Sequence, residues 1–375
     1  MWEQCKIRPG PGGLTNAERR DWLTLARTPR IGPVTFFQLL ARYGDAGRAL
    51  KALPNISTRI STKARPSDAI IDQELRQTTV FGARLICAAD PDFPQLLKQF
   101  APPPPVLTML GQTALVHRRC IAIVGARQAS AAGRKLAKDL ARDLSDAGFV
   151  IVSGLARGVD GEAHAASLHG GTIAVLGGGI DHVYPPQHDR LYDAIVENGL
   201  LISESPFGHR ATARDFPRRN RIITGLAEGV VVIEAAERSG SLISARTALE
   251  QNREVMAVPG SPLEPRSAGT NRLLRDGATL VRHADDVVEA LSNPPQNRMK
   301  SPDAPKYDDD IDPAMDIPKS QIERVYADLG PTPVHICDLA RTAQLSAQRC
   351  AAILVELELA GRATTYAGGF ASRSI

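Results

Sequence analysis

Short apolar runs that end in small residues recur along the middle of the chain, and they constrain the fold more than any other feature. Six of them lie between residues 121 and 260: IAIVGAR, FVIVSG, TIAVLGGG, LLISES, VVVIEAA and EVMAVPG. Each is followed by an amphipathic stretch, as at residues 130–147 and 241–252. Apolar strands that alternate with helices are typical of a parallel sheet covered on both faces. The sequence therefore predicts a doubly wound α/β domain over residues 81–293.

The segment before this domain has a helical pattern. Residues 14–53 carry apolar residues at helical spacing, broken at ArgIleGlyPro and at TyrGlyAsp. They predict a small helical domain within residues 1–80. The turn IGPVT, residues 31–35, has two interpretations. It is either a glycine hairpin of the kind that approaches a phosphate backbone or a simple turn between two helices.

A third part follows a linker. Residues 294–318 are rich in proline and aspartate and have no periodic apolar pattern, which is typical of a linker. Beyond it we expect helices at 320–329, 335–342 and 346–360, and then a hairpin closed by Gly368 and Gly369. This order predicts a winged-helix domain over residues 319–375.

The last of these three helices has an acidic balance. It carries Arg349 against Glu356 and Glu358. A helix that enters a duplex groove needs cations or other donors for the phosphates. We therefore favour a partner-docking or regulatory role for this domain over the reading of bases in duplex DNA.

Composition sets few further limits. The chain has 375 residues, of which 43% are apolar and 23% charged, and its net charge of +4 only mildly favours an anionic partner. The five cysteines are scattered without a CxxC pair, so we expect no disulfide framework or zinc knuckle and a reducing compartment. No apolar run approaches the ~18 residues of a membrane span. We expect a cytoplasmic protein without a membrane partner.

Small residues crowd the ends of the predicted strands, which is where parallel sheets bind ligands. They are Gly125, Ser153, Gly154, residues 177–179, Ser239, Gly240, Ser241, Pro259 and Gly260. Glycine lets a backbone N–H approach a phosphate, and Ser130 and Ser241 are placed to cap helices. The edge is therefore predicted to bind phosphate. Neither GxxxxGK[ST] nor GxGxxG occurs there, so ATP hydrolysis and NAD chemistry lose support and we expect no cofactor.

An arginine cluster follows the fourth run. Residues 207–225 hold five arginines against one acid, Asp215. If Pro217 occupies the first helical position, Arg218, Arg219 and Arg221 lie in the first turn and a half. Cations there oppose the helix dipole at about 0.3–1 kcal/mol each, unless an anion lies among them.

Phe216 places an aromatic face beside these guanidinium groups, a pairing that single-stranded nucleic acid uses. The alternative is that the arginines pair with acids of the sheet edge, such as Glu204 or Glu234, and that Phe216 is a core residue. Arg127 favours the first interpretation, because it follows Gly125 at the same predicted edge and adds to the positive charge.

Metal and hydrolytic sites are not indicated. The histidines at 164 and 169, and at 182 and 188, lack the spacing of helical ligand pairs, so we expect surface or capping roles. Acids near strand ends could in principle form a carboxylate site, but no pair is forced together. These acids are Asp160, Glu162, Asp181, Glu204 and Glu234. We predict no catalytic residue and no metal ligand.

With these residues in view, the chain resembles the DNA-processing protein A family, also called DprA or Smf. The matching segments include IAIVGARQAS, VIVSGLARGVDGEAH, GGTIAVLGGGIDHVYP, SESPFG, FPRRNRIITGL, EAAERSGSLISARTALEQNREVMAVPG and GTNRLLRDGA, in family order over residues 85–291. One departure is His188, where the family usually has asparagine. The resemblance implies a SAM-like helical domain, a Rossmann-like domain and a winged helix.

The resemblance also implies a function without catalysis. Such proteins bind and protect single-stranded DNA, help to load the RecA recombinase in natural transformation, and form homodimers through the Rossmann-like domain. The family's DNA pocket falls here on Arg127, Phe216, Arg219 and Asn220, with Ser239 and Gly240 as backbone contributors. The charge and strand-end arguments add Arg218, Arg221, Gly154 and Ser241 to the predicted DNA-binding residues.

Two other functions stay open from the sequence. A glycine-rich Rossmann edge also resembles nucleotide-binding phosphoribohydrolases, but their PGGxGTxxE-like loop corresponds here to EAAERSGSLISAR, without the glutamate in the expected place. A regulator that reads duplex DNA through the winged helix is the other alternative.

Overall fold

The computed structural model describes residues 13–56, 65–99, 102–292, 318–366 and 369–374. The chain divides into two compact units. One comprises Met1–Gln73, Cys87–Pro91 and Asp303–Ile375, and the other comprises Glu74–Ile86 and Asp92–Pro302. Residues 294–317 of the predicted linker lie outside the described residues, and so does Gly368 of the predicted hairpin. The domain boundaries proposed above stay predictions.

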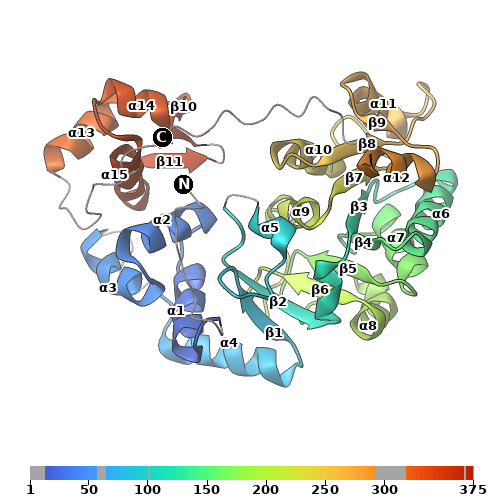
Figure 1. The fold of residues 1–375 in the computed structure, drawn as a ribbon, viewed down its shortest axis with the longest axis horizontal. Helices are drawn as coiled ribbons and strands as arrows, with labels where there is room; N and C mark the ends of the chain where they lie inside the picture. Colours follow the sequence, from blue (N-terminus) through green and yellow to red (C-terminus); the bar gives the residue numbers. More distant parts are fainter. Residues whose placement is uncertain (1–12, 57–64, 100–101, 293–317, 367–368, 375) are drawn as a thin grey trace. The chain divides into compact units, whose positions relative to one another are not determined.

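The second unit contains a nine-stranded sheet in the order β1-β2-β6-β5-β4-β3-β7-β8-β9 (Figure 1). Its strands are β1 (Arg84–Cys87), β2 (Val106–Gly111), β3 (Cys120–Val124), β4 (Val150–Ser153), β5 (Thr172–Leu176), β6 (Leu200–Ser203), β7 (Gly229–Val232), β8 (Glu254–Ala257) and β9 (Thr279–Leu280). Neighbouring strands from β6 to β9 are parallel, and β2 pairs antiparallel with β6. The strands β5-β4-β3-β7-β8-β9 follow the Rossmann order.

The six predicted strands are confirmed as β3 to β8. The sheet also has β1, β2 and β9, which the apolar runs did not reveal, and the antiparallel β2 makes it mostly rather than wholly parallel. A run of prolines just before β2 obscured its apolar pattern VLTMLG, and β9 has only two residues.

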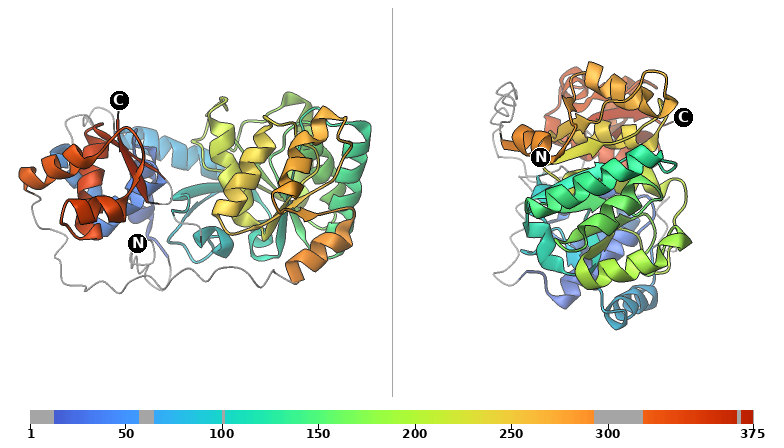
Figure 2. Two further views of the ribbon diagram at one scale, coloured as in Figure 1. Left: turned by 90° about the horizontal axis from the view of Figure 1, so that it is seen from above. Right: turned by 90° about the vertical axis from the view of Figure 1, so that its right-hand side faces the viewer.

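Helices cover both faces of this sheet (Figures 1 and 2). They are α5 (Gln95–Lys98), α6 (Ala131–Asp146), α7 (Val159–Ser167), α8 (Asp189–Asn198), α9 (Asp215–Leu226), α10 (Gly240–Glu250), α11 (Ala268–Arg275) and α12 (Ala284–Ser292). α6, α7 and α12 share one apolar core with β3, β4, β7 and β8, and side chains such as Ile121, Leu140 and Ile151 are fully buried in it or nearly so. No helix among the described residues is long and apolar enough to cross a membrane.

The predicted N-terminal helices are α1 (Asn16–Arg27), α2 (Pro33–Tyr43) and α3 (Ala46–Ile56), and α4 (Asp68–Val80) follows them. Thr15 and Glu18 form a capping box at the start of α1. Trp22, Phe36 and Phe37 pack edge to face, with ring centroids 5.0 to 6.3 Å apart. This aromatic cluster holds α1 against α2.

The C-terminal part is a winged helix, as predicted. It contains α13 (Lys319–Asp328), α14 (Ile336–Thr342) and α15 (Ala347–Leu359), with a sheet of β10 (Val334–His335), β12 (Phe370–Arg373) and β11 (Ala363–Tyr366). β11 and β12 form the antiparallel hairpin. Cys350, Ile353 and Leu354 of α15 lie in its core.

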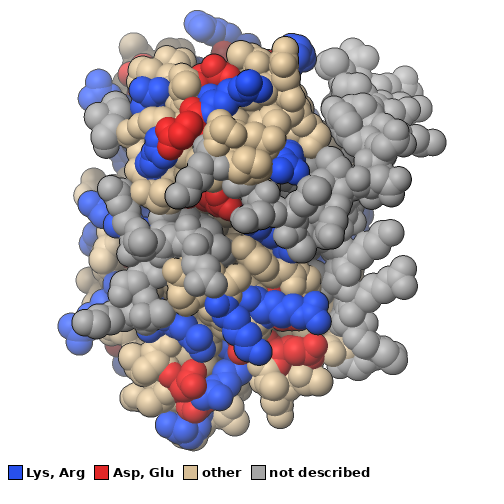
Figure 3. Space-filling model, turned by 90° about the vertical axis from the view of Figure 1, so that its left-hand side faces the viewer, with Lys and Arg blue, Asp and Glu red and all other residues tan. Residues whose placement is uncertain are grey.

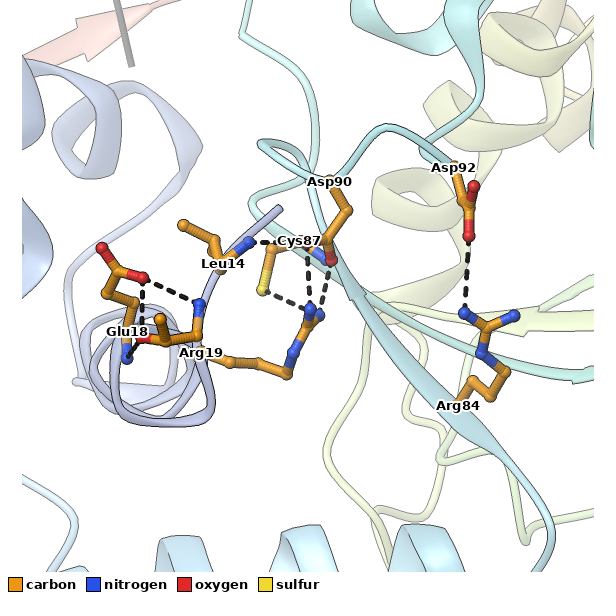
Figure 4. Close-up of polar contacts among 8 residues, drawn as sticks. Leu14, Glu18, Arg19, Arg84, Cys87, Asp90 and Asp92 are labelled. Carbon is orange, nitrogen blue, oxygen red and sulfur yellow. Dashed lines mark hydrogen bonds and ion pairs between the residues drawn. The ribbon is translucent and has the colours of Figure 1, made fainter. Parts of the chain in front are cut away.

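An ion pair fixes α1 to the loop after β1 (Figure 4). Arg19 donates Nη1 to Asp90 Oδ2 at 2.5 Å and Nη2 to Asp90 Oδ1 at 3.0 Å. The same carboxylate accepts the Cys87 backbone N–H at 2.8 Å and is nearly buried. Figure 4 also shows Arg84 beside Asp92, an ion pair at 3.4 Å whose side chains are both 61% exposed.

Replacing Asp90 with alanine should therefore lower the free energy of unfolding of the N-terminal helical domain by about 1–3 kcal/mol, because Arg19 and the Cys87 N–H lose a buried acceptor. Asp92→Ala is the matched control and should cost less than about 0.5 kcal/mol, because its ion pair is solvated. Urea unfolding followed by tryptophan fluorescence measures both, since Trp22 lies in the helical domain. Equal effects of the two substitutions would contradict the assignment.

Candidate functional site

A pocket opens at the carboxyl ends of β3, β4 and β5, near the point where the strand order reverses. Its walls come from the loops after these strands and from the first half of α9. The lining residues are Arg127, Gly154, Ala156, Arg157, Leu176, Gly177, Gly178, His182, Tyr184, Pro185, Ala211, Phe216 and Arg219. None of these residues is acidic, and the arginines among them come from three different segments.

Arg219 forms the floor of this pocket and is only 6% exposed. Its Nη1 donates to the Gly154 carbonyl at 2.6 Å and also to the Val175 carbonyl. Its Nε is buried without a hydrogen-bond partner among the described residues. The guanidinium thus bonds to backbone oxygens at the ends of β4 and β5, and no carboxylate of the described residues lies within ion-pair distance of it.

Burial lowers the pKa of Arg219 to about 10, with the Asp160 carboxylate opposing this shift and the nearby Arg127 adding to it. Arg219 therefore remains a cation at neutral pH. Burial likewise raises the pKa of Asp160, which Arg219 and the N–H groups of Gly154 and Ala156 oppose. The carboxylate of Asp160 thus shapes the loop after β4 while partly balancing the buried cation.

Arg127 and Phe216 meet at the rim. The exposed Arg127 places its guanidinium carbon 4.9 Å from the centroid of the Phe216 ring. The Tyr184 ring also lies beside Phe216, with the two centroids 5.5 Å apart and the ring planes tilted by 39°. Tyr184 is 48% exposed, so an aromatic surface and a cation are both open to solvent at the rim.

Sequence reasoning missed Arg157, His182 and Tyr184 as lining residues. Arg157 follows β4 by four residues and is exposed. Their positions could have indicated this, because all three residues lie in the loops that follow predicted strands at the ligand-binding edge of the sheet. Their side-chain directions depend on irregular backbone, such as Leu155 at φ 55°, and no periodic pattern reports that.

The start of α9 differs from the prediction. The helix begins at Asp215, so Pro217 is its third residue rather than its first. Asp215 accepts the Thr212 N–H at 2.7 Å and contacts His209 Nε2 at 2.9 Å. Each arginine therefore lies two residues further into the helix than expected, where the helix dipole is weaker. The dipole cost that we assigned to them is therefore too large.

Arg218 and Arg221 follow the alternative interpretation. Arg221 pairs with Glu204 at 2.5 Å and Arg218 pairs with the same carboxylate at 3.1 Å. Glu204 follows β6 and its side chain is 11% exposed. For these two arginines the pairing with a sheet-edge acid, which the sequence left open, is the one observed. Two cations share one acid, however, so one positive charge remains in excess, and Arg218 is 58% exposed.

The other predicted binding residues lie outside the lining of the pocket. Asn220 is half-buried on α9. Ser239, Gly240 and Ser241 stand at the start of α10, after β7. Ser239, rather than Ser241, caps this helix by accepting the Ser241 N–H. At Gly240 an added Cβ would meet nothing within 4 Å, so this turn is open to solvent.

Most strand-end glycines make room for the protein rather than for a ligand. A Cβ at Gly125 would lie 2.6 Å from Val159, and one at Gly154 would lie 2.3 Å from Arg219 Nη1. At Gly177 it would lie 3.2 Å from the Phe216 ring. The prediction that these glycines admit a phosphate to the backbone is therefore not supported by their packing.

Four of the acids near the strand ends, Asp160, Asp181, Glu204 and Glu234, hold groups of the protein itself. Glu234 accepts the Ser130 N–H at 2.9 Å and the Ser130 hydroxyl at 2.5 Å, and Ser130 caps α6 as predicted. Asp181 accepts the Gly208 N–H at 2.9 Å. Among the described residues no group of acids, histidines and cysteines is arranged to hold a metal ion.

Two histidines have structural positions. His164 is fully buried, with Nδ1 2.7 Å from the Thr172 hydroxyl and Nε2 3.3 Å from the Leu155 nitrogen. Burial lowers its pKa to about 3, so it is neutral in the fold, and the surface or capping role expected for it is wrong. His188 contacts the Leu155 carbonyl at 3.0 Å. Both fix the loop that carries Arg157.

The fold and this pocket define a class: a Rossmann-like domain with a basic, aromatic strand-end pocket, accompanied by a helical domain and a winged helix. Models of known families match all three parts. DNA recombination-mediator protein A matches residues 84–292, the DprA-like N-terminal HHH domain matches 16–76, and the DprA winged helix domain matches 312–369. The chain belongs to the DNA recombination-mediator protein A family, DprA/Smf.

Relatives and solved structures agree with this family. Protein Smf of Escherichia coli is 40% identical over 296 residues, 75% of either chain, and Protein Smf of Synechocystis is 35% identical over 295 residues, 74% of either chain. The X-ray structure of DprA from Streptococcus pneumoniae matches with a TM-score of 0.58 at 31% identity, covering 76% of this chain and 95% of that one. DNA processing protein A from Helicobacter pylori, whose structure concerns its single-stranded DNA binding mode, matches at 0.52 and 30%, covering 56% and 96%.

Gly154→Ala should destabilise the sheet domain by about 1–3 kcal/mol, because the new methyl group would displace the Arg219 guanidinium from its carbonyl partners. Gly240→Ala is the control: its methyl group meets open space and its stability should change by less than about 0.5 kcal/mol. Urea unfolding followed by circular dichroism measures both. A Gly154→Ala variant with the stability of the unmodified protein would show that Arg219 is not held by the carbonyls of Gly154 and Val175.

Proposed function

We propose that this protein binds single-stranded DNA in the pocket at the ends of β3, β4 and β5 and mediates recombination without catalysing a reaction. The observation that carries the proposal is the Arg127 guanidinium over the Phe216 ring, directly beside the buried cation of Arg219. Cations and exposed aromatic rings in one groove are what single strands need for phosphate neutralisation and base stacking. The absence of acidic residues from the described lining supports an anionic ligand.

Each part of the pocket has its own role in this proposal. Arg127 and Arg157 are exposed and can follow the phosphates, whereas Arg219 holds the floor in place and adds its charge from below. Phe216 and Tyr184 offer faces for bases that are already unstacked. Bases in a duplex are stacked on one another, so the pocket should prefer single strands.

The wider set of predicted contacts remains part of the proposal. The excess charge of Arg218 and Arg221 over Glu204 can continue the basic path along α9, with Asn220 between them. The open turn of Ser239, Gly240 and Ser241 offers backbone N–H groups at the start of α10. Gly154 contributes by admitting Arg219.

Partners follow from the family. We propose that the protein helps to load RecA on incoming DNA in natural transformation and that it forms a homodimer through the Rossmann-like domain. Two pockets in a dimer would bind one strand with avidity, because the second contact becomes intramolecular. The pattern of free cysteines, Cys87, Cys120, Cys337 and Cys350, is compatible with the cytoplasm that we expected from the sequence.

The position of Glu234 argues against the phosphoribohydrolase alternative. In nucleotide-binding α/β domains the phosphate lies at the helix N-terminus after the first Rossmann strand. Here the Glu234 carboxylate occupies that place at the start of α6, bonded to Ser130. A second anion beside it would be repelled.

We therefore expect no base release from nucleoside monophosphates. A panel of purine and pyrimidine monophosphates, incubated with the protein and analysed by chromatography, tests this. Release above the level without protein, lost on Glu234→Gln, would restore the enzyme interpretation.

Single-stranded DNA binding is tested by fluorescence anisotropy with a labelled oligothymidine and with a duplex of equal length. Arg127→Ala should weaken binding of the single strand about tenfold or more, because a phosphate contact and the cover of Phe216 are lost. Log affinity should fall with log salt, by about 0.7 per phosphate contact, and the variant should have the shallower slope. Arg127 is preferred to Arg219 because its side chain is exposed and its removal should not disturb the fold.

Arg142→Ala serves as the control, since Arg142 lies on the outer part of α6, is 50% exposed and pairs with Asp143. It should bind like the unmodified protein. Equal losses for Arg127→Ala and Arg142→Ala would point to diffuse attraction without this pocket. Preference for the duplex, abolished by removal of the winged helix, would favour a regulator that reads duplex DNA through that domain.

A further inference from the structure

The winged helix does not present its third helix in the way that a duplex-reading domain would. Among the residues of α15 whose side chains are described, none is exposed. Arg349, the basic residue of this helix, donates Nε to Gln321 Oε1 on α13 at 2.8 Å and is used within the domain. The remaining charges, Glu356 and Glu358, are acidic and would be repelled by phosphates. Basic and acidic side chains are interspersed on the face of the molecule seen in Figure 3.

These two acids contact the N-terminal helical domain, which belongs to the same compact unit. Arg42 of α2 donates Nη1 to Glu356 Oε1 at 2.9 Å, and the two side chains are only 18% and 20% exposed. The Arg42 guanidinium also lies 5.4 Å from the centroid of the Tyr43 ring. Arg42 is therefore held on two sides in the position that meets Glu356.

The second acid makes a parallel connection. Glu358 accepts the hydroxyl of Thr35, near the start of α2, at 3.2 Å. It also accepts the N–H of Thr365 in β11 at 3.1 Å and the Thr365 hydroxyl at 2.8 Å. Its carboxylate is thus fixed by the winged helix itself and presented to α2. Thr35 is 3% exposed, so this contact excludes water.

An apolar contact accompanies the charges. Val355 precedes Glu356 and is only 3% exposed, although it is not part of the apolar cluster that forms the winged-helix core. α15 and α2 pack against each other, so a buried apolar side chain and the ion pair occur in neighbouring positions of a helix that contacts α2. An apolar centre with charged groups around it is the usual composition of a specific protein interface.

We propose that the acidic end of α15 is a docking surface whose partner is the α2 face of the chain's own helical domain, and that this domain does not read duplex DNA. The ion pair of Arg42 and Glu356 gives the contact its specificity, because a like charge on either side would be repelled. Thr35, the last residue of the turn IGPVT, makes its hydrogen bond to Glu358 in this same contact. This inference is independent of the single-strand pocket, which lies in the other unit.

Charge exchange in the full-length protein tests the docking. Amide hydrogen exchange, read by mass spectrometry, is compared for the unmodified chain, Arg42→Glu, Glu356→Arg and the double variant. Each single reversal should raise exchange about tenfold in both α2 and the second half of α15, since it places like charges together. The double reversal should restore most of the protection, and exchange in the sheet domain should be unchanged throughout.

Arg48→Glu is the matched control on the same domain, because Arg48 is 75% exposed and its ion pair among the described residues is a local one, with Asp45. This substitution should leave amide exchange in α15 unchanged. Exchange that rises only in the substituted helix would overturn the docking. So would a double variant whose amides in α2 and α15 are no better protected than those of the single variants.

A duplex-binding measurement on the same proteins separates the competing role. Neither the unmodified chain nor Arg42→Glu should bind a 20-base-pair duplex through the winged helix, because release of α15 exposes acids. Gain of duplex binding by Arg42→Glu, lost again in the double variant, would show that α15 is a duplex reader held in reserve and would overturn the proposal.

Discussion

The buried guanidinium of Arg219 is the interaction on which the arrangement of the pocket depends. Its hydrogen bonds to the carbonyls of Gly154 and Val175 tie α9 across the ends of β4 and β5. Because Phe216 precedes Arg219 by three residues, the same bonds set the aromatic ring at the rim, where Arg127 covers it. A cation so deeply buried needs compensation, which Asp160 and the carbonyl dipoles supply. The rest of the pocket follows from where this one side chain lies.

Two places for an anion therefore exist along one sheet edge, and they are used differently. At the β3–β7 side, where Rossmann domains bind dinucleotide phosphates, the Glu234 carboxylate accepts the N–H and hydroxyl of Ser130, the N-cap of α6. At the β4–β5 side the described lining is cationic and aromatic and includes no acid, although Asp160 partly balances the charge of Arg219. A carboxylate of the protein thus occupies the usual nucleotide-phosphate position, and the basic pocket lies at the neighbouring strand ends. This division explains how a Rossmann-like fold can serve a polymeric ligand without a nucleotide fingerprint.

The sequence predicted the elements better than the contacts between them. Continuous apolar runs revealed β3 to β8, since a strand buried on both faces has a composition that turns lack. The arginine cluster correctly marked α9, but not that Glu204 would take two of its members, because that pairing depends on the register of α9 against β6. Nor could spacing show that Gly154 admits a guanidinium rather than a phosphate. Tyr184 and Arg157 sit on irregular loops, and only the folded backbone brings them to the pocket.

Photo-crosslinking tests the central claim most directly. An oligothymidine with a single 5-iododeoxyuridine, irradiated in complex with the unmodified protein, forms covalent adducts with aromatic side chains that stack on the base. Mass spectrometry of the digested adducts should locate them at Phe216 or Tyr184, whose rings meet at the rim of the pocket. Adducts confined to residues 318–374, with none in the sheet domain, would contradict the account.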